Sequence, residues 1–459
     1  MPAREDKDMT QMSSDTATRS QHAQELMGKI EQRTAVVGIV GLGYVGLPLA
    51  RAVMDAGYPV LGYDTDGEKI DALDQGRCYI EHLGDEFFNE LRTSEAFSAS
   101  SDPQSLAGAD LVLLCVPTPL GSHNEPDLGY VLDSTRMVSK ILRPGQLVVL
   151  ESTTYPGTTR QEMMPLLLEG GLECGKDFFL AYSPEREDPG SPGRSAAVIP
   201  KLVGGVDETS GDLAFQFYSN AVASVHKVST AEVAESAKLL ENIYRAVNIA
   251  LVNEMKTVLT DMDVDIWEVI DAAATKPFGF QAFYPGPGLG GHCIPIDPFY
   301  LSWKAKEIGR HTHFIELAGE INTSMPLYVI DRLAEALNTQ SKPIRGSRVL
   351  VMGIAYKPNV DDARESPAAE IMDLLAERGA IIEYHDPHLP TFPRMRNYDL
   401  DMKSVRLDEN TVKSTDVVLI VTDHDAVDYD LIGEHASLIV DTRNAMSRAA
   451  SIRGTLVKA

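Results

Sequence analysis

The sequence predicts an α/β protein with an N-terminal Rossmann-type domain, a central helical domain and a smaller, Rossmann-like C-terminal α/β domain. Three observations predict this fold. Short apolar runs alternate with helix-like segments up to about residue 228, which is typical of βαβ units around a parallel sheet. The stretch from Thr230 to Thr260 contains neither Gly nor Pro, and strand-like runs resume at Ser347. At about 100–200 residues per domain, a chain of 459 residues accommodates three domains.

The first domain is expected over residues 34–228. Its first strand, Thr34–Val40, is a β-branched run that ends at a glycine-rich turn, and an apolar helix follows. A second strand is expected at residues 59–64. Further apolar runs of the same kind lie at residues 111–117, 146–152 and 178–183.

The central domain is expected over residues 229–339. Its first helix spans Thr230–Thr260, because apolar residues recur there at intervals of three, four or seven. These residues are Val233, Ala237, Leu240, Tyr244, Val247, Leu251 and Val258. A loop rich in Gly and Pro follows, and a second helical stretch runs from about Tyr300 to Asn338.

The C-terminal domain is expected over residues 340–459. Its first strand lies within Ser347–Tyr356. Later strands are expected at residues 381–386, 416–422 and 437–443. Ser366 and Pro367 precede an apolar helix, as an N-cap and a first helical residue do.

The charge of the chain excludes some classes of partner. The 41 Lys and Arg residues face 67 Asp and Glu residues, which gives a net charge of −26. A nucleic-acid-binding protein needs a broad basic surface to replace the counterions of the phosphates, so no nucleic-acid partner is expected. Docking on anionic lipid is disfavoured as well. An anionic small molecule remains compatible, because a local cluster of Lys and Arg can bind it.

Cysteine usage and hydropathy indicate a cytoplasmic protein. The four cysteines are too scattered for a disulfide scaffold, and without a C-x-x-C pair no metal is expected. No apolar run approaches the roughly 20 residues that cross a bilayer, so no membrane partner is expected. The N-terminal segment lacks the apolar core of a secretory signal. We expect residues 1–33 to form a mobile tail with about one helical turn near its end.

A glycine-rich fingerprint lies between the first strand and the first helix. Gly41 permits the tight turn, Gly43 lets the backbone approach a pyrophosphate, and Gly46 lets the helix pack on the strand. Asp64 ends the second strand, where a carboxylate binds a ribose 2′-hydroxyl and repels a 2′-phosphate. The pattern therefore predicts NAD rather than NADP, although Lys69 lies near enough to meet a phosphate. The alternative is a glycine turn that binds no ligand.

The loop that holds Cys293 is the most unusual stretch of the chain. It has the sequence GGHCIPIDP, and a cysteine in such a loop is not packed as core by default, in contrast to Cys115 within an apolar run. Cys293 can act as a nucleophile toward an aldehyde or acyl carbon, and Asp297 can orient or activate water. The alternatives are a loop cysteine without chemistry and a structural His292.

The long helix also offers a polar face. Lys238, Asn242 and Arg245 lie at i, i+4 and i+7, opposite the apolar positions. A Lys and an Asn on one face can hold an oxyanion. The alternative is a solvated polar face, which is the commoner meaning of such a pattern. The cysteine loop favours the catalytic interpretation.

Taken together and in this order, the motifs resemble those of the nucleotide-sugar dehydrogenases, that is, the UDP-glucose and UDP-N-acetylhexosamine 6-dehydrogenases. The resemblance covers roughly residues 34–445. The segments that carry it are GLGYVGLPLA, CVPTP, ESTTYPGTT, YSPER, KLVGG, AESAKLLENIYRAVNIALVNE, GPGLGGHCIPIDPFYL, MGIAYKPNVDDARESPA and VDTRN. It implies a four-electron oxidation by NAD at the sugar 6-position, through an aldehyde and then a thiohemiacetal and a thioester on Cys293, to a uronic acid.

The resemblance also implies roles for individual residues. The expected catalytic residues are Cys293 as nucleophile, Lys238 and Asn242 for the oxyanion, Asp297 for the thiol or water, and Thr118 and Glu185 for positioning water and the reacting centre. The expected cofactor-binding residues are Gly41, Gly43, Tyr44, Val45, Gly46, Asp64, Lys69, Pro117, Thr118, Thr153 and Arg364. The expected substrate-binding residues, with UDP mainly on the C-terminal domain, are Glu185, Arg186, Lys238, Asn242, Arg245, Gly290, Tyr356, Lys357 and Arg443.

Departures from the UDP-glucose branch point to the N-acetylhexosamine branch. Ile296 stands where the UDP-glucose branch has Lys, and Arg186 follows Glu185 where that branch has Phe-Leu. The second glutamate of that branch has no assigned counterpart here, with Glu187 as a candidate. The segment FGFQAFYPGPGLGG is most similar to UDP-N-acetylglucosamine 6-dehydrogenases. We therefore expect UDP-N-acetylglucosamine as substrate, ahead of UDP-N-acetylmannosamine and UDP-glucose, with a product that feeds a surface polysaccharide.

The resemblance further implies a homodimer formed through the helical domain. Two other functions remain open at this point: a regulator that binds NAD or a nucleotide sugar without turnover, and an epimerase that uses NAD transiently. Only the dehydrogenase requires the thiol of Cys293, so replacing Cys293 by Ala separates the three.

Overall fold

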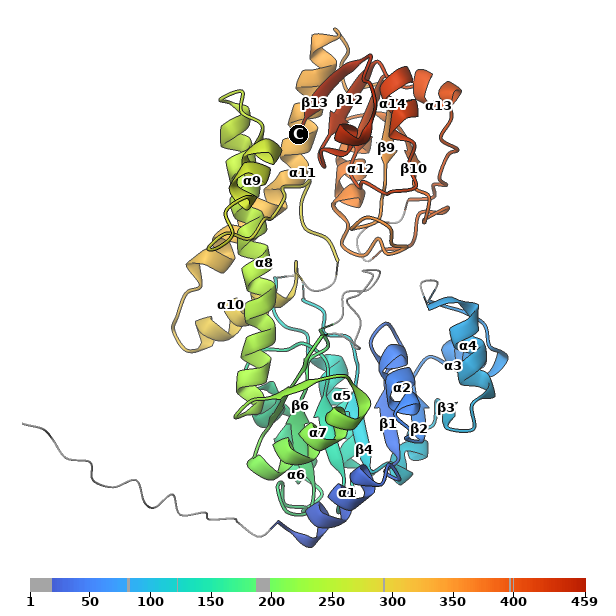
Figure 1. The fold of residues 1–459 in the computed structure, drawn as a ribbon, viewed down its shortest axis with the longest axis vertical. Helices are drawn as coiled ribbons and strands as arrows, with labels where there is room; N and C mark the ends of the chain where they lie inside the picture. The colour runs from blue at the N-terminus through green and yellow to red at the C-terminus, as the bar shows by residue number, and fades with distance from the viewer. Residues whose placement is uncertain are drawn as a thin grey trace, which may run out of the picture.

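The N-terminal and C-terminal domains lie toward opposite ends of the long axis of the molecule, and the central helices connect them along one side (Figure 1). The computed structural model describes residues 19–459 except 81–82, 122, 187–198, 292–293, 396–397 and 399. The N-terminal sheet lies at the bottom of the view, the long green helix α8 rises from it, and the C-terminal domain lies at the top in orange and red. The predicted three-domain α/β fold is confirmed. Among the residues described, no helix combines the length and apolarity that a membrane span requires.

The N-terminal domain is built on an eight-stranded sheet in the order β3-β2-β1-β4-β5-β6-β7-β8. Its strands are β1 Val37–Val40, β2 Val60–Tyr63, β3 Phe97–Ser100, β4 Leu111–Leu114, β5 Leu147–Leu150, β6 Phe179–Tyr182, β7 Lys201–Gly205 and β8 Val225–Lys227. Neighbouring strands are parallel except β6 and β7, and Val37 of β1 lies beside Val60 and Leu111. β1, β4, β5 and β6 are buried throughout, which explains their unbroken apolar runs.

Helices cover both faces of this sheet. They are α2 Gly46–Asp55, α3 Gly67–Gln75, α4 Gly84–Thr93, η2 Pro103–Gly108, α5 Gly129–Ser139, η3 Thr158–Met163, α6 Met164–Leu168 and α7 Glu208–Ala221. The five predicted strands correspond to β1, β2, β4, β5 and β6. The sequence pattern does not predict β3, β7 and β8, because β3 and β8 are partly exposed edge strands and β7 contains two glycines.

A helix precedes β1 and corrects the expected tail. α1 spans Gln21–Glu31 and packs on α7. Ala23, Leu26 and Ile30 are buried in the core of the N-terminal domain. These three residues share one helix face, but they are too few in a polar segment for their spacing to indicate a helix. The expectation of a mobile tail is therefore wrong for residues 21–31.

α8 spans Ala231–Thr260 and confirms the predicted long helix. Glu235, in its second turn, is fully buried and anchors it to the N-terminal domain. Its carboxylate accepts hydrogen bonds from the N–H of Gly157 at 2.6 Å and from the N–H and hydroxyl of Thr159 at 2.9 and 2.7 Å. These groups lie at the start of η3, where backbone N–H groups have no partner within the helix. The start of α8 is thus fixed beside the sheet.

The two faces of α8 are reversed relative to an ordinary surface helix. Its buried stripe carries the polar residues Glu235, Lys238, Asn242, Asn253 and Lys256. The predicted apolar positions point outward instead: Leu240 is 66% exposed and Leu251 is 52% exposed. A surface helix normally buries its apolar stripe, whereas α8 exposes it in the single chain and buries polar residues instead.

Two helices replace the single second stretch that the sequence predicts. α10 spans Asp297–Glu307 and α11 spans His313–Thr339, and the chain turns between them, where Gly309 has a φ of +71°. The short helix α9, Ile266–Ala274, follows α8 directly. α11 packs along α8 and against α12, so it links the central helices to the C-terminal domain.

The C-terminal domain has a wholly parallel sheet in the order β10-β9-β11-β12-β13. Its elements are β9 Arg348–Met352, α12 Pro367–Glu377, β10 Ile381–His385, α13 Glu409–Lys413, β11 Val417–Ile420, α14 Tyr429–His435, β12 Leu438–Asp441, η4 Ala445–Arg448 and β13 Thr455–Lys458. The first four strands are as predicted, whereas the sequence pattern does not predict β13, a partly exposed edge strand. Ser366 caps α12 as predicted, because its hydroxyl accepts from the N–H of Ala368 at 3.3 Å.

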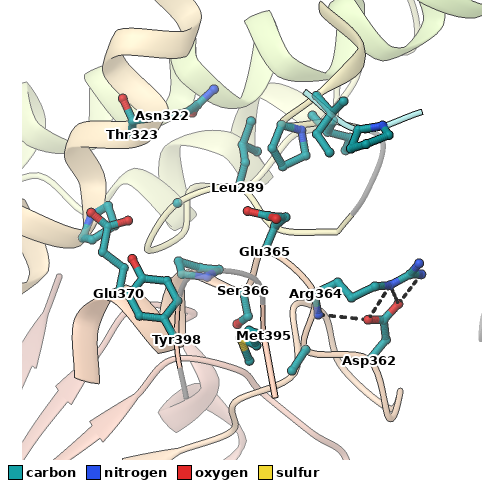
Figure 2. A pocket seen from close by; sticks show the side chains of 18 of the residues that line it. Leu289, Asn322, Thr323, Asp362, Arg364, Glu365, Ser366, Glu370, Met395 and Tyr398 are labelled. Atoms are coloured by element: carbon teal, nitrogen blue, oxygen red, sulfur yellow. Dashed lines mark hydrogen bonds and ion pairs between the residues drawn. The ribbon is translucent and has the colours of Figure 1, made fainter. Parts of the chain in front are cut away.

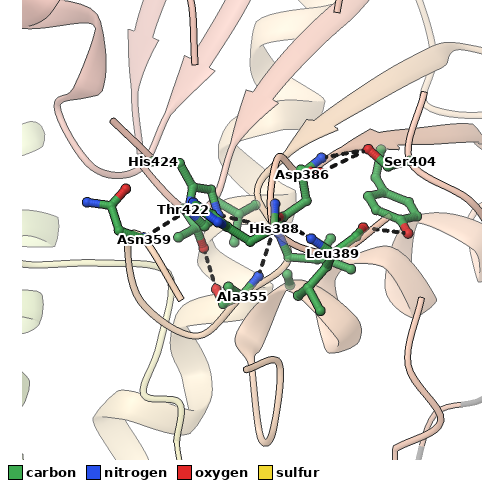
Figure 3. Close-up of polar contacts among 12 residues, drawn as sticks. Ala355, Asn359, Asp386, His388, Leu389, Ser404, Thr422 and His424 are labelled. Carbon is green, nitrogen blue, oxygen red and sulfur yellow. Dashed lines mark hydrogen bonds and ion pairs between the residues drawn. The ribbon is translucent and has the colours of Figure 1, made fainter. Parts of the chain in front are cut away.

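The C-terminal sheet repeats the strand arrangement around the fingerprint, and side chains of the domain bind the loop after its first strand (Figure 3), as Asp64 binds Leu42 in the N-terminal domain. Asp386, just beyond β10, accepts from the N–H of Ile354 at 2.7 Å. His424 lies beside it, with Nε2 at 3.1 Å from the carboxylate, and its Nδ1 accepts from the N–H of Asn359 at 3.0 Å. Both side chains are buried.

Candidate active site

The fingerprint loop between β1 and α2 has the geometry that its glycines predict. Gly41 has a φ of +95°, and a Cβ there would lie 2.3 Å from the carbonyl oxygen of Cys115. A Cβ on Gly46 would lie 1.8 Å from the carbonyl oxygen of Gly41. A Cβ on Gly43 would meet nothing within 4 Å, so the space over this residue is open to a ligand. Val45, the N-cap of α2, provides no side-chain cap, which suits the start of this helix to a phosphate.

Asp64 lies just beyond β2 and is 7% exposed. One of its carboxylate oxygens accepts from the N–H of Leu42 and from Nζ of Lys69, each at 2.9 Å. The carboxylate thus joins the fingerprint loop to β2, at the position where it can accept from a ribose hydroxyl. Because Lys69 is paired with it, the site presents no bare cation to a 2′-phosphate. These residues fit NAD.

Tyr44 connects the fingerprint loop with the C-terminal domain. The guanidinium of Arg364 lies over the Tyr44 ring, with Cζ 4.3 Å from the ring centroid. Arg364 also donates to both carboxylate oxygens of Asp362 at 2.7–3.0 Å. The structure thus brings together two predicted cofactor-binding residues from motifs that lie 320 residues apart.

The predicted residues after β4 and β5 lie at the same edge of the sheet. Pro117 and Thr118 follow β4 and Thr153 follows β5, and both strands run parallel to β1. The carbonyl oxygen of Thr118, which is buried, accepts from the hydroxyl of Tyr300 at 2.6 Å. Tyr300 belongs to α10, so this bond holds α10 at the ligand-binding edge of the sheet.

Three polar residues of α8 converge on Asp297, the first residue of α10. Asn242 donates through Nδ2 to the Asp297 carboxylate, and Arg245 donates to Oδ1 of Asn242. Lys238 is 5% exposed, and Asp297 is 2% exposed. Burial raises the pKa of Asp297 to about 7, against the lowering effects of Lys238, the Asn242 hydrogen bond and Arg245. This carboxyl group can therefore exchange a proton near neutral pH.

Glu185 and Arg186 follow β6 and belong to a second group of ionisable residues. Lys201 of β7 pairs with Glu151 at 2.7 Å and with Glu185 at 3.4 Å. Arg186 pairs with Glu241 of α8 at 2.6 Å. Sequence reasoning missed Lys201, which pairs with Glu185, and Glu151, which pairs with Lys201. The signal for both is a charged residue inside or directly after a buried strand, because such a charge needs a partner.

Cys293 lies outside the described residues, so the surroundings of its loop come from its neighbours. Gly291 donates its N–H to the carbonyl oxygen of Arg364 at 3.0 Å. A Cβ on Gly290 would lie 2.7 Å from the Cβ of Tyr356. The cysteine loop therefore lies directly on the C-terminal domain, and only a glycine fits at residue 290 without displacing Tyr356.

Lys357 and Arg443 are the predicted basic residues of the C-terminal domain. Nζ of Lys357 lies 5.6 Å from the centroid of the Tyr356 ring. Arg443 follows β12 and lies against Gly286, where a Cβ would be 2.5 Å from its Nη1. The structure thus brings Arg443 to the segment that leads to Cys293 and places Lys357 beside Tyr356, which lies against Gly290 of the same segment.

A cavity of about 580 Å³ lies where the three domains meet. Its lining includes Tyr44 and Pro119 of the N-terminal domain, Leu289 and residues 294–296 of the cysteine loop, Asn322 and Thr323 of α11, and Arg364, Glu365 and Glu370 of the C-terminal domain. Figure 2 shows side chains from α11, the loop and the C-terminal domain around it. A cleft at a domain junction is the usual position of a small-molecule site.

Models of one protein family match three successive parts of the chain. They are the NAD binding domain of the UDP-glucose/GDP-mannose dehydrogenase family at residues 35–222, its central domain at residues 232–324 and its UDP binding domain at residues 350–448.

Named relatives cover most of the chain. A UDP-N-acetyl-D-glucosamine 6-dehydrogenase from Pseudomonas aeruginosa is 36% identical over 366 residues, which are 79% of this chain and 85% of the relative. A UDP-N-acetyl-D-mannosamine dehydrogenase from Pyrococcus horikoshii is 34% identical over 416 residues, 89% of this chain and 95% of the relative. The solved structure of the UDP-D-ManNAc dehydrogenase from Pyrococcus horikoshii matches with a TM-score of 0.83 and 32% identity, over 92% of this chain and 98% of that one. The chain is therefore a member of the UDP-glucose/GDP-mannose dehydrogenase family, whose N-terminal domain binds NAD.

Proposed function

We propose that the chain oxidises the 6-hydroxyl group of UDP-N-acetyl-D-glucosamine to a carboxylate, with Cys293 as the nucleophile. The observation that carries this proposal is the buried contact of α8 with Asp297, four residues after Cys293, beside the edge of the NAD-binding sheet. NAD, held by the fingerprint loop and Asp64, supplies the hydride acceptor for each of two oxidation steps. The residues of the chain bind the sugar, stabilise the negative charge on its oxygen and transfer the protons.

Lys238 and Asn242 stabilise the negative charge that develops on the sugar oxygen. Asn242 donates one N–H of its amide to Asp297. The second N–H of this amide has no acceptor among the described residues, so this N–H can donate to the substrate. Arg245 fixes the amide orientation because it donates to Oδ1. The buried ammonium of Lys238 adds positive charge where water is excluded, and a fixed charge there stabilises an oxyanion strongly.

Asp297 moves the proton of the hydrolytic step. A pKa of about 7 allows it to accept a proton from the water that attacks a thioester on Cys293. Once protonated, it can return that proton to the departing thiolate. Thr118 and Glu185 position water and the reacting centre in this proposal. Glu185 is suited to that role because Lys201, itself paired with Glu151, holds its carboxylate.

The UDP part of the substrate binds against the C-terminal domain in this proposal. The match of residues 350–448 to the family's UDP binding domain supports it. Lys357 and Arg443 supply positive charge, and Gly290 lets the backbone of the cysteine loop approach Tyr356 of this domain.

The choice of sugar rests on the resemblance of the cysteine loop and on the relative from Pseudomonas aeruginosa. UDP-N-acetyl-D-mannosamine is the second candidate, because the named enzyme from Pyrococcus horikoshii covers even more of the chain. The two sugars differ in configuration at one carbon, so a single contact to the acetamido group can decide between them. In either case the uronic acid product would serve as a precursor of surface polysaccharide.

We further propose that two chains associate through the exposed apolar stripe of α8. Leu240, Tyr244, Leu251 and Val258 are between 47% and 66% exposed and lie on one face of the helix. An apolar stripe of this length is unfavourable in water, and pairing of the same stripe about a two-fold axis would bury it on both chains.

The decisive experiment measures NADH absorbance with the purified full chain, NAD and three sugars in parallel: UDP-N-acetylglucosamine, UDP-N-acetylmannosamine and UDP-glucose. We expect two NADH per UDP-N-acetylglucosamine, little signal from the other two, and none from Cys293→Ala. Signal mainly from another sugar would keep the reaction and overturn the substrate. No NADH from any of them, or an unchanged rate in Cys293→Ala, would overturn the reaction.

A further inference from the structure

Lys256 is a buried lysine without a carboxylate partner. It is 1% exposed, its Nζ donates to the carbonyl oxygen of Gly286 at 3.3 Å, and it lies 5.1 Å from the centroid of the Tyr328 ring. Within the described part of the chain no carboxylate pairs with it, and the charged group that acts on it is another cation, Arg443. A buried ammonium without a counter-ion is unfavourable, so its position requires an explanation.

Gly286, which precedes the cysteine loop, is contacted by side chains of α8 and of the C-terminal domain. Its N–H donates to Oδ1 of Asn253 at 2.9 Å, and its carbonyl oxygen accepts from Lys256. Asn322 of α11 orients Asn253, because its Oδ1 accepts from Nδ2 of Asn253 at 3.0 Å. Arg443 occupies the side where a Cβ would lie. Lys256 and Arg443 therefore face each other across one backbone residue.

Arg443 is a second cation without an ion pair among the described residues. Its Nε donates to the carbonyl oxygen of Val421 at 3.0 Å. Of the two carboxylates that act on it, Asp423 pairs with Arg448 at 2.5 Å, and Asp441 accepts from the backbone N–H of Arg443 at 2.9 Å. Two neighbouring cations are thus left without a direct counter-ion in a chain whose net charge is −26.

We propose that Lys256 is a positioning residue for the diphosphate of the nucleotide sugar: Arg443 contacts the diphosphate, and Lys256 supplies a second positive charge from beneath Gly286 while holding Gly286 in place. The identity of the ligand rests on the proposed function. Two cations around one backbone residue match the two negative charges of a diphosphate diester, and the anion provides the counter-charge that the protein lacks.

The arrangement couples nucleotide binding to a proton. In the free protein, burial and the nearby Arg443 lower the pKa of Lys256 to about 7. A bound anion favours the charged form and raises that pKa, so binding above about pH 7 takes up a proton. Affinity is then highest below about pH 7 and falls as the pH rises. The other titratable groups around this pair are Tyr328 on α11, and Asp423 and Asp441 beside Arg443.

Calorimetric titration of the full chain with UDP-N-acetylglucosamine, without NAD, tests the proposal. Titrations at about pH 6.5 and about pH 8.5, in two buffers of different ionisation enthalpy, report affinity and proton uptake together. We expect wild-type Kd to rise about tenfold at the higher pH, as a shift of about one pKa unit requires, with net proton uptake. Lys256→Met keeps the volume without charge, and Lys256→Gln keeps a donor to Gly286 without charge. Both should lose the pH dependence and the uptake, and bind about tenfold more weakly at the lower pH.

Two comparisons separate charge from structure. Asp297→Asn removes a second buried group whose pKa burial shifts to about 7 and should keep the proton uptake if Lys256 causes it. Uridine carries no diphosphate, so wild type and Lys256→Gln should bind it equally. Proton uptake that persists in Lys256→Gln, or equal losses for uridine and the UDP-sugar, would overturn the inference. Wild type that binds none of the three UDP-sugars would instead overturn the proposed function.

Discussion

Replacing Asp297 by Asn removes the carboxyl group whose pKa burial raises to about 7, and it keeps nearly the same volume. A base with that pKa is about one tenth ionised at pH 6 and about nine tenths ionised at pH 8, so a rate that depends on it rises about tenfold between the two. We expect this rise in kcat for wild type. The variant should show a flat profile and a kcat lower by a factor of about 10²–10⁴, which is the usual contribution of a general base.

Initial rates of NADH formation at saturating NAD and UDP-sugar provide the profile. Acid quenching followed by intact mass spectrometry should show that the variant accumulates an acyl group on Cys293, because hydrolysis is the slowed step. Asp331→Asn is the matched control. It removes an exposed carboxylate of α11 whose only ion pair among the described residues is with Arg378 at 3.7 Å, and it should behave as wild type. A pH slope that survives in Asp297→Asn would refute the assignment of Asp297 as the titrating base.

The same substitution has a second readout in stability. The folded pKa of Asp297, about 7, lies above its unfolded value of about 3.8, so its contribution to stability is present below about pH 4 and lost as pH rises through about 7. A difference of about 3 units corresponds to at most about 4 kcal/mol. Asn carries no charge at any pH, so the variant should melt above wild type at pH 8 but not at pH 4. A lower Tm at pH 8 would mean that the bond to Asn242 outweighs the cost of burial.

Three further substitutions test other parts of the site. Gly286→Ala places a Cβ 2.5 Å from Arg443 and should raise KM for the UDP-sugar at least tenfold while leaving the Kd of NAD unchanged; an equal rise in both would show a general collapse of the loop. Leu240→Glu puts a charge on the exposed stripe of α8 and should give a monomer by analytical ultracentrifugation, whereas an unchanged mass would contradict the proposed dimer. Asp64→Ala should weaken NAD binding by about 1–3 kcal/mol in a direct binding titration, and it should reduce the preference for NAD over NADP. An unchanged ratio of the Kd values for NAD and NADP would refute the role of Asp64.

Features set by local rules were predictable from the sequence. Gly41 and Gly46 are required by a turn and a close approach that involve a few neighbouring residues, so their spacing was sufficient. The Ser366 cap of α12 depends on two adjacent residues and is present as predicted. The length of α8 follows from the absence of helix breakers and from the recurrence of its apolar residues.

Features set by tertiary packing were not predictable. The periodicity of α8 shows that it has two faces, but it does not show which face another element covers, and here the polar face is buried. The proposed role of Lys256 depends on Gly286, which accepts its hydrogen bond, and on Arg443, which lies against Gly286 and is far away in the sequence. Glu151 likewise looks like the end of an apolar strand until Lys201 is placed beside it.

The capped start of α12 in the C-terminal domain has a consequence for the order of events in catalysis. In the residues that the structure describes, Ser366 caps α12, so the first helix of this second Rossmann-like sheet lacks the uncapped start that α2 offers to a phosphate. Among the described residues, the fingerprint loop with α2 is thus the one strand–loop–helix unit with an uncapped helix start at the first strand of its sheet, while the proposed oxidation consumes two NAD.

The two cofactors must therefore take turns. The first NADH leaves and the second NAD enters while the half-oxidised sugar stays behind, so cofactor exchange has to be faster than loss of the intermediate. In the proposed mechanism, a covalent bond to Cys293 retains the carbon end of the sugar, and the proposed contact of Arg443 with the diphosphate retains the other end. In this mechanism the affinity of the chain for the diphosphate determines processivity, that is, the fraction of sugars that leave as the acid and not as the aldehyde.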